Sequence, residues 1–248
     1  MEKPTMAGYI LDNSEELGEK AAELIAQKLN EAIEKKGKAR IILSTGASQF
    51  ETIKYLVEKN VDWEKVTMFH LDEYLELPET RKASFRRYLK ERFTSKVPVK
   101  VHFVNTEGDV EENLKELTSE IRKDIIDIGV IGIGENGHIA FNDPPADFET
   151  REAYRIVELE ERCRKQQLNE GWFQTLDDVP FKAVSMTPYQ IMQCETIVSS
   201  VPGERKAEAV RNTLKSDEVT NMVPATLLKT HKDWHLFLDK ESSSLIDS

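Results

Sequence analysis

Apolar and polar positions follow two rhythms along the chain, one typical of helices and one typical of short buried strands. Apolar residues three and four apart predict a first helix that begins after Asn13 and ends at Gly37. The apolar run from Arg40 to Leu43 predicts the strand that follows. Further strands are predicted at 66–70, 101–104, 125–133, 154–157, 183–186, 196–200 and 234–238, and further helices at 48–59, 84–93, 109–123, 160–168, 204–214 and 224–230.

This alternation of strands and helices is typical of a mainly parallel sheet that is covered by helices on both faces. No internal repeat, low-complexity block or linker rich in proline, glycine and serine divides the chain. We therefore expect an α/β protein in which residues 1–248 form a single Rossmann-like domain. In such sheets, ligands bind beyond the carboxyl ends of the strands, near the point where the strand order reverses.

Composition narrows the class of partner. The net charge of −11 disfavours nucleic acid and anionic membrane surfaces as general partners. The N-terminus does not read as a secretory signal, and no apolar run approaches the ~20 residues of a membrane span. The two cysteines, Cys163 and Cys194, form no CxxC pair. We expect a cytoplasmic protein, and the sequence leaves a homo-oligomer open.

A loop rich in hydroxyl groups joins the strand 40–43 to the next helix. It reads Ser44-Thr45-Gly46-Ala47-Ser48, with Ser48 as the expected helix cap. Backbone N–H groups at a helix start are unpaired and favour an anion, and Gly46 allows close approach to the backbone. The loop is neither a Walker loop nor a GxGxxG, so it implies no nucleotide. A phosphate site and a simple capping turn both fit it.

Asp72 and Glu73 follow the strand 66–70. Adjacent side chains of an extended backbone point in opposite directions, so at most one of these carboxylates faces a ligand cleft. That carboxylate can serve as a general base, and a solvated turn residue is the alternative.

The stretch GIGENGHIAFNDPP, residues 132–145, follows the predicted strand 125–133 directly. His138 lies between Asn136 and Asp143 in this stretch, a pattern that favours an oriented proton carrier near neutral pH. A single histidine without a nearby histidine or cysteine provides too few ligands for a metal, so we expect none. The alternative is a structural turn that contains a hydrogen-bonded histidine.

Glu204-Arg205-Lys206 opens the helix predicted at 204–214. Cations are unfavourable at a helix start unless an anion binds there, so Lys206 is a candidate second phosphate contact. A solvated charge run explains the segment equally well.

Together these segments resemble the glucosamine-6-phosphate deaminase family, also called glucosamine-6-phosphate isomerase, which is related to 6-phosphogluconolactonases. The resemblance rests on the four motifs at 44–48, 70–74, 132–144 and 203–207 in this order, and HLDEY and GHIAFN favour deaminase over lactonase. It implies ring opening of an amino-hexose 6-phosphate, proton transfer from C2 to C1 and release of ammonia, without a cofactor. Glucosamine 6-phosphate is the first expected substrate and galactosamine 6-phosphate the second.

The resemblance also implies roles for individual residues. Asp72 would shuttle the proton, and His138 would act in ring opening with Asn136 and Asp143 beside it. The phosphate would be held by Thr45, Gly46, Ala47, Ser48 and Lys206. Further substrate contacts are expected from Gly137, Gln167 and Arg162, with Arg164 as another candidate, and the polar segment 149–174 is expected to cover the site.

Two residues depart from the pattern of some family members, which have an aspartate in place of Asn136 and a glutamate in place of Asp143. Asn136 cannot relay a proton but can orient His138, and Asp143 has a shorter reach. Three alternatives therefore stay open: lactone hydrolysis, aldose–ketose isomerisation without deamination, and a regulator that binds a sugar phosphate without catalysis.

Overall fold

The computed structural model describes residues 2–247, and ten strands form two sheets in this part of the chain. The main sheet has seven parallel strands, whose order is β1 (Met6–Leu11), β10 (Trp234–Asp239), β9 (Thr196–Val201), β6 (Ile128–Val130), β2 (Ala39–Leu43), β3 (Val66–His70) and β5 (Lys100–His102). A small antiparallel sheet contains β4 (Asp72–Tyr74), β8 (Lys182–Met186) and β7 (Tyr154–Glu158). The predicted single α/β domain with a mainly parallel sheet is confirmed.

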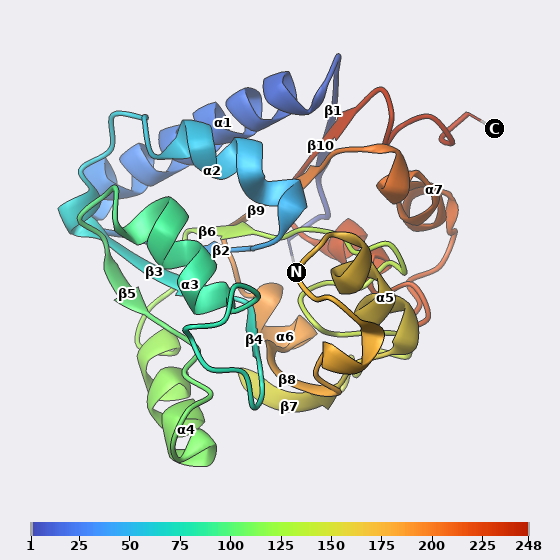
Figure 1. The fold of residues 1–248 in the computed structure, drawn as a ribbon. Helices are drawn as coiled ribbons and strands as arrows, with labels where there is room; N and C mark the ends of the chain where they lie inside the picture. Colours follow the sequence, from blue (N-terminus) through green and yellow to red (C-terminus); the bar gives the residue numbers. More distant parts are fainter. Residues whose placement is uncertain (1, 248) are drawn as a thin grey trace.

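Helices cover both faces of the main sheet (Figure 1). One face carries α1 (Ser14–Lys36), α2 (Phe50–Leu56) and α3 (Phe85–Leu89), and the other carries α4 (Val110–Ile121), α6 (Pro188–Ile191) and α7 (Ala207–Lys215). The remaining helix, α5 (Glu161–Asn169), packs beside the small sheet. Short turns complete the set: the 3-10 helices η1 (Ala47–Gln49), η2 (Trp63–Lys65), η4 (Leu176–Asp178), η5 (Glu204–Lys206) and η6 (Pro224–Thr230), and the π-helical turn η3 (Lys90–Thr94).

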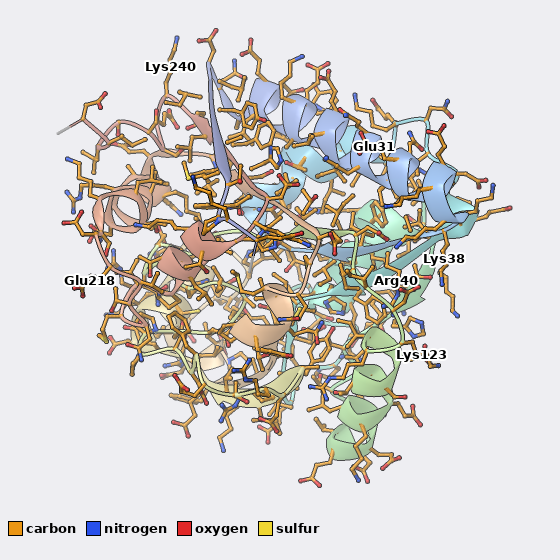
Figure 2. All side chains as sticks on the ribbon, turned by 180° about the vertical axis from the view of Figure 1, so that it is seen from behind. Glu31, Lys38, Arg40, Lys123, Glu218 and Lys240 are labelled. Atoms are coloured by element: carbon orange, nitrogen blue, oxygen red, sulfur yellow. The ribbon has the colours of Figure 1, made fainter. Side chains whose placement is uncertain are left out.

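Strand β2 shows why the sequence requires two covered faces. All five of its residues are buried, with Ile41 and Leu43 in the core under α1 and α2, and Ile42 in the core under α4. Burying one such aliphatic side chain contributes about 1.5–3 kcal/mol. Arg40, labelled in Figure 2, donates hydrogen bonds to the carbonyls of Glu120, Ile121 and Asp124 and so fixes the end of α4 against β2.

The strand order reverses between β2 and β6. From β2 the chain moves outward through β3 to β5, and from β6 it moves outward in the other direction through β9 to β10. Loops that leave these two neighbouring strands therefore diverge and open a space between them. The loops 44–48 and 132–145 start at this point.

The first helix begins and ends as predicted. The Asn13 side chain accepts a hydrogen bond from the Glu16 amide at 2.9 Å, and Gly37 adopts a φ of +76° at the other end. The predicted cap at Ser48 is wrong, because Gly46 with a φ of +99° is the residue that precedes η1. The strand predicted at 125–133 is shorter, and only Ile128–Val130 pair as a strand before the polar loop begins.

Strand β1 was not predicted. It lies at the edge of the sheet, pairs only with β10 and leaves most of its side chains exposed, so it lacks the apolar pattern of a buried strand. In the described range 2–247, none of the helices combines the length and the apolar character that crossing a bilayer requires.

Candidate active site

A cleft opens at the carboxyl ends of the central strands, where the strand order reverses. Its cavity volume is about 60 Å³, below the roughly 300–1,000 Å³ that is usual for small-molecule sites, so a ligand must extend towards the open side of the cleft. Five separate parts of the chain supply its polar lining. These are Thr45, Gly46 and Ser48 after β2, Asp72 in β4, Gly134 and His138 after β6, Gln166, Gln167 and Glu170 of the α5 region, and Lys206 in η5.

The loop 44–48 is tied to its neighbours on both sides. The Ser44 hydroxyl accepts a hydrogen bond from the Gly132 amide at 3.0 Å, which joins the loop to the one after β6. The Tyr88 hydroxyl donates to the Gly46 carbonyl at 2.8 Å. Because the loop is fixed in this way, its N–H groups and the Thr45 and Ser48 hydroxyls form a preorganised set of donors at one end of the cleft.

Lys206 lines the cleft together with this loop, and with Ser48 it also lines an adjoining cavity. Its side chain is buried, and Nζ donates a hydrogen bond to the Ile133 carbonyl at 2.7 Å. Burial lowers the pKa of the Lys206 ammonium, against the opposing effect of Glu170 and Glu135. The lysine and the loop together can bind an anion, as the sequence suggested.

Asp72 and Glu73 lie on opposite sides of β4, in agreement with the extended backbone. Asp72 lines the cleft, whereas Glu73 is fully buried beneath it. The Glu73 carboxylate accepts hydrogen bonds from the Ser84 hydroxyl and from three backbone N–H groups, those of Tyr74, Phe85 and Arg86, and it pairs with the Arg86 guanidinium at 3.1 Å. Glu73 therefore fixes β4 against the start of α3, and Asp72 remains available for a ligand.

The environment of Asp72 suits a base. Burial, followed by the nearby negative charges of Glu73 and Asp143, raises the pKa of the Asp72 carboxyl well above its usual value. Within residues 2–247, the carboxylate has no hydrogen-bond partner. A carboxylate whose pKa is raised accepts a proton from carbon more readily than an ordinary one.

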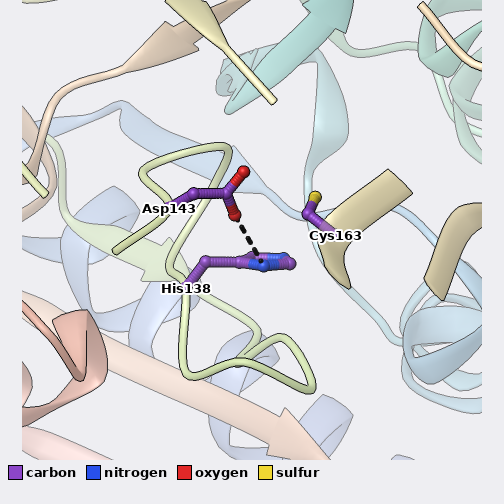
Figure 3. Close-up of side chains that lie close together, drawn as sticks. All are labelled: His138, Asp143 and Cys163. Atoms are coloured by element: carbon purple, nitrogen blue, oxygen red, sulfur yellow. Dashed lines mark ion pairs between the residues drawn. The ribbon is translucent and has the colours of Figure 1, made fainter. Parts of the chain in front are cut away.

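A hydrogen-bond network orients the His138 ring. Nδ1 lies 2.6 Å from the Asn136 side-chain oxygen. It also lies 3.2 Å from an Asp143 oxygen, the contact that Figure 3 marks with a dashed line. The Asn136 side-chain nitrogen donates to Asp143 at 3.1 Å and to Glu160 at 2.9 Å. The shorter Asp143 side chain thus reaches the histidine.

These contacts determine which ring nitrogen carries the proton. The Asn136 amide nitrogen faces two carboxylates, so its oxygen must face the ring. An amide oxygen only accepts hydrogen bonds, and Nδ1 is therefore the protonated nitrogen. Nε2 has no hydrogen-bond partner within residues 2–247 and can accept a proton from a ligand.

The fold brings Cys163, which is distant in the sequence, close to His138 and Asp143. Ligand atoms of His138, Asp143 and Cys163 lie within 4.8 Å of one another, although the sequence showed no cysteine near the histidine (Figure 3). This donor set can bind zinc, but Nδ1 and both Asp143 oxygens are already hydrogen-bonded to protein groups. Burial also raises the pKa of the Cys163 thiol, which opposes the thiolate that a metal needs. The cluster is therefore better suited to orienting His138 than to holding a metal.

Asp143 is held as a carboxylate in this cluster. Burial alone would raise its pKa, but hydrogen bonds from His138, the Glu160 amide and Asn136 outweigh burial and lower the pKa below its usual value. A permanent negative charge beside Nδ1 stabilises the ring whenever Nε2 takes up a proton.

Several predicted contacts lie outside the cleft. Arg162 is half-exposed, pairs with Glu208 at 2.9 Å on the surface and does not line the cleft, so its substrate contact stays a prediction that this structure does not support. Arg164 is buried under the Phe181 ring and donates to the carbonyls of Leu176 and Val179. Gly137 has a φ of +84° and does not line the cleft, and a Cβ at this position would lie 3.1 Å from the Val223 side chain.

Other predicted residues keep a place at or beside the cleft. Gln167 lines it, whereas Ala47 lines an adjoining cavity. From the segment 149–174, Gln166, Gln167 and Glu170 line the cleft, and the covering role of the segment stays a prediction. Glu170 was missed, although the spacing of Cys163, Gln166, Gln167 and Glu170 places all four on one helix face, a signal that the sequence contains.

Comparison with known proteins agrees with this geometry. The family model described as glucosamine-6-phosphate isomerases/6-phosphogluconolactonase matches residues 12–237. The glucosamine-6-phosphate deaminases of Halothermothrix orenii and of Thermoanaerobacter sp. (strain X514) are 35% and 33% identical to this chain. Each alignment covers 97% of this chain, and they cover 100% and 95% of those proteins, respectively.

Solved structures of related proteins have the same fold as this chain. One described as a monomeric glucosamine-6-phosphate deaminase has a TM-score of 0.87 at 30% identity, covering 97% of this chain and 99% of that one. The 6-phosphogluconolactonase from Thermotoga maritima has a TM-score of 0.79 at 20% identity, covering 95% of this chain and 100% of that one, which shows a common fold. The resemblance predicted from the four motifs is confirmed, and the chain belongs to the family of glucosamine-6-phosphate isomerases and 6-phosphogluconolactonases.

Proposed function

We propose that this chain is a sugar-phosphate isomerase and deaminase. It converts an amino-hexose 6-phosphate, glucosamine 6-phosphate first, into a ketose 6-phosphate and ammonia. One observation carries the proposal: a single cleft contains the Asp72 carboxylate, the oriented His138 ring and a donor loop with a lysine. The deaminase names of relatives that match over nearly the whole chain favour this reaction over the alternatives.

Ring opening is the first step, and His138 carries it. Nε2 takes the proton of the anomeric hydroxyl, the bond between C1 and the ring oxygen breaks, and a proton returns to that oxygen. The open chain then has an aldehyde at C1 and the amino group at C2. The fixed Nδ1 contacts to Asn136 and Asp143 support this role, because they keep Nε2 directed to the ligand.

Proton transfer from C2 to C1 follows, and Asp72 carries it. The carboxylate removes the C2 proton, and the electron pair moves through an enolamine. The same carboxyl group returns the proton to C1, which leaves an iminium at C2. One water molecule then replaces the nitrogen, so a ketone and ammonia are formed. A carboxylate that is 6% exposed supports this step, because little solvent competes for the proton.

The phosphate anchors the substrate far from the reacting carbons. Thr45, Gly46, Ser48 and Lys206 would bind it, with Gln167 beside them. Binding energy at this end restricts the position of C1 and C2 under Asp72. We propose neither a metal nor an organic cofactor, since every step moves protons or water.

An ammonia-release assay on purified protein tests the proposal. Its panel contains glucosamine 6-phosphate, galactosamine 6-phosphate, glucose 6-phosphate and 6-phosphogluconolactone. Ammonia from an amino-hexose phosphate supports deamination, and the preferred epimer identifies the configuration required at C4. Lactone hydrolysis or glucose 6-phosphate isomerisation without ammonia release would favour the corresponding alternative. Sugar-phosphate binding without turnover would identify a regulator.

We also propose that the protein acts as a monomer in the cytoplasm. The solved structure with the TM-score of 0.87 is described as monomeric, which favours a monomer over the homo-oligomer that the sequence left open. The two buried free cysteines fit a reducing compartment. Light scattering of the purified protein tests the assembly.

A further inference from the structure

Glu170 places a negative charge at the end of the cleft that we assign to the phosphate. Its carboxylate oxygen Oε2 lies 3.9 Å from the position that a Cβ would take on Gly46. Glu170 and Lys206 line the same cleft, and they interact electrostatically. A carboxylate beside the donor loop is unexpected, because a phosphate needs that space to be free of negative charge.

The structure holds the Glu170 side chain in this place. Oε1 accepts a hydrogen bond from the Gln166 side chain at 3.3 Å, and Oε2 accepts one from the Trp172 indole at 3.1 Å. Trp172 in turn packs edge-on against Phe50 and Tyr88. The residue also ends α5, where the helix dipole disfavours an acid. Its position therefore depends on specific side-chain contacts and is not favoured by the helix itself.

Lys206 is the main cation near this charge, and most other charged residues around it are acidic. An adjoining cavity shares Ser48, Glu170 and Lys206 with the cleft. Its lining contains six acidic residues and only two cations, Arg205 and Lys206. Arg205 is exposed and its guanidinium donates to the Asn169 carbonyl at 3.4 Å. Lys206 is thus the one buried cation that faces the carboxylate in this lining.

We infer that Glu170 is a specificity-determining residue, which weakens binding of a dianionic phosphate at the Thr45–Ser48 loop and leaves binding of an uncharged sugar end unaffected. The site then has one positive and one negative group at its anchoring end. It discriminates less between a phosphate and a free hydroxyl at C6 than a purely basic site would. This inference rests on the proposed function in taking a hexose as the ligand and in placing its phosphate at the Thr45–Ser48 loop.

Calorimetric binding to the Glu170→Gln variant tests the inference without turnover. The probes are glucitol 6-phosphate and glucitol, which have no ring to open. Glutamine keeps an oxygen for the Trp172 indole and removes only the charge. We expect the variant to bind glucitol 6-phosphate about tenfold more tightly, the effect of one like charge at short range in a partly solvated site. We expect glucitol binding to change less than twofold. Glu204→Gln, the same charge change at an exposed position of the adjoining cavity, is the matched control and should change neither affinity.

Unchanged or weaker binding of glucitol 6-phosphate by Glu170→Gln would overturn the inference. A purely structural role for Glu170 would weaken both ligands and lower the melting temperature, which overturns it as well. The outcome is separable from that of the proposed function. Tighter phosphate binding with no ammonia release by the wild type would retain the inference and refute the deaminase. Ammonia release by the wild type together with unchanged binding of glucitol 6-phosphate by Glu170→Gln would support the deaminase and overturn the inference.

Discussion

At the scale of single residues, the chemistry depends on the different surroundings of two neighbouring carboxylates, Asp72 and Glu73. Glu73 receives a full set of hydrogen bonds and a guanidinium, whereas Asp72 receives none within residues 2–247 and lines the cleft. The sequence predicted that only one of them faces the ligand. It could not predict the burial that raises the pKa of Asp72, because the residues that bury it come from distant segments.

Asp72→Asn should lower kcat by about 10³-fold or more, the usual scale for loss of a general base. Binding of glucitol 6-phosphate should stay within about tenfold, because the anchoring groups are untouched. Steady-state kinetics and calorimetry measure the two effects. Glu73→Gln is the comparison variant, because it removes the neighbouring carboxylate that has a structural role. It should lower the free energy of unfolding by about 3–5 kcal/mol, because Arg86 is then buried without its charged partner. Retained turnover in Asp72→Asn would contradict the assignment.

Asp72→Asn should also be more stable than the wild type at neutral pH. A carboxyl whose pKa is raised by folding stabilises the fold only while protonated, and this contribution is lost as pH rises through the raised pKa. Removing the buried charge should therefore add about 1–2 kcal/mol to the free energy of unfolding near pH 7 and almost nothing near pH 4. Urea unfolding of both proteins at pH 7 and pH 4 measures this gain in the free energy of unfolding. A larger gain at pH 4 than at pH 7 would contradict the prediction.

At the scale of elements, the site depends on loops that regular periodicity cannot position. The strand and helix patterns predicted β2, β3, α1 and α4 well, because buried apolar residues determine them. The proximity of His138, Asp143 and Cys163 was not predictable, since it joins the loop after β6 to α5, two segments that only the tertiary fold brings together. Arg162, which was expected near the substrate, pairs with Glu208 on the surface instead, because the sequence alone does not show which face of α5 lines the cleft.

Gly134 offers a test of the loop after β6. A Cβ at this position would overlap atoms of the His138 ring. Gly134→Ala should therefore displace the ring and lower kcat by about 10²-fold, the scale expected when a catalytic group is misplaced by an ångström. Gly8→Ala in β1 is a control for substitution at a glycine, since its φ lies outside the positive region and only the flexible end of the Met6 side chain, at 3.7 Å, lies within 4 Å of its Cβ position. Normal turnover in Gly134→Ala would mean that this ring position is not required.

At the scale of the whole molecule, the net charge of −11 opposes an anionic substrate. Raising sodium chloride from about 10 mM to about 150 mM shortens the Debye length from roughly 30 Å to roughly 8 Å and screens this repulsion. We expect kcat/KM for the sugar phosphate to rise by about twofold with salt, and kcat to stay constant. A marked fall in kcat/KM would indicate that local attraction at Lys206 dominates the encounter instead.

The central claim is that one carboxylate in one cleft moves a hydrogen from C2 to C1. The most direct measurement follows deuterium placed at C2 of glucosamine 6-phosphate into the ketose product by mass spectrometry and NMR. The account predicts a slower reaction than with the unlabelled substrate and deuterium at C1 in part of the product, since buried Asp72 returns the atom that it removed. A product without deuterium at C1, formed at an unchanged rate, would contradict it.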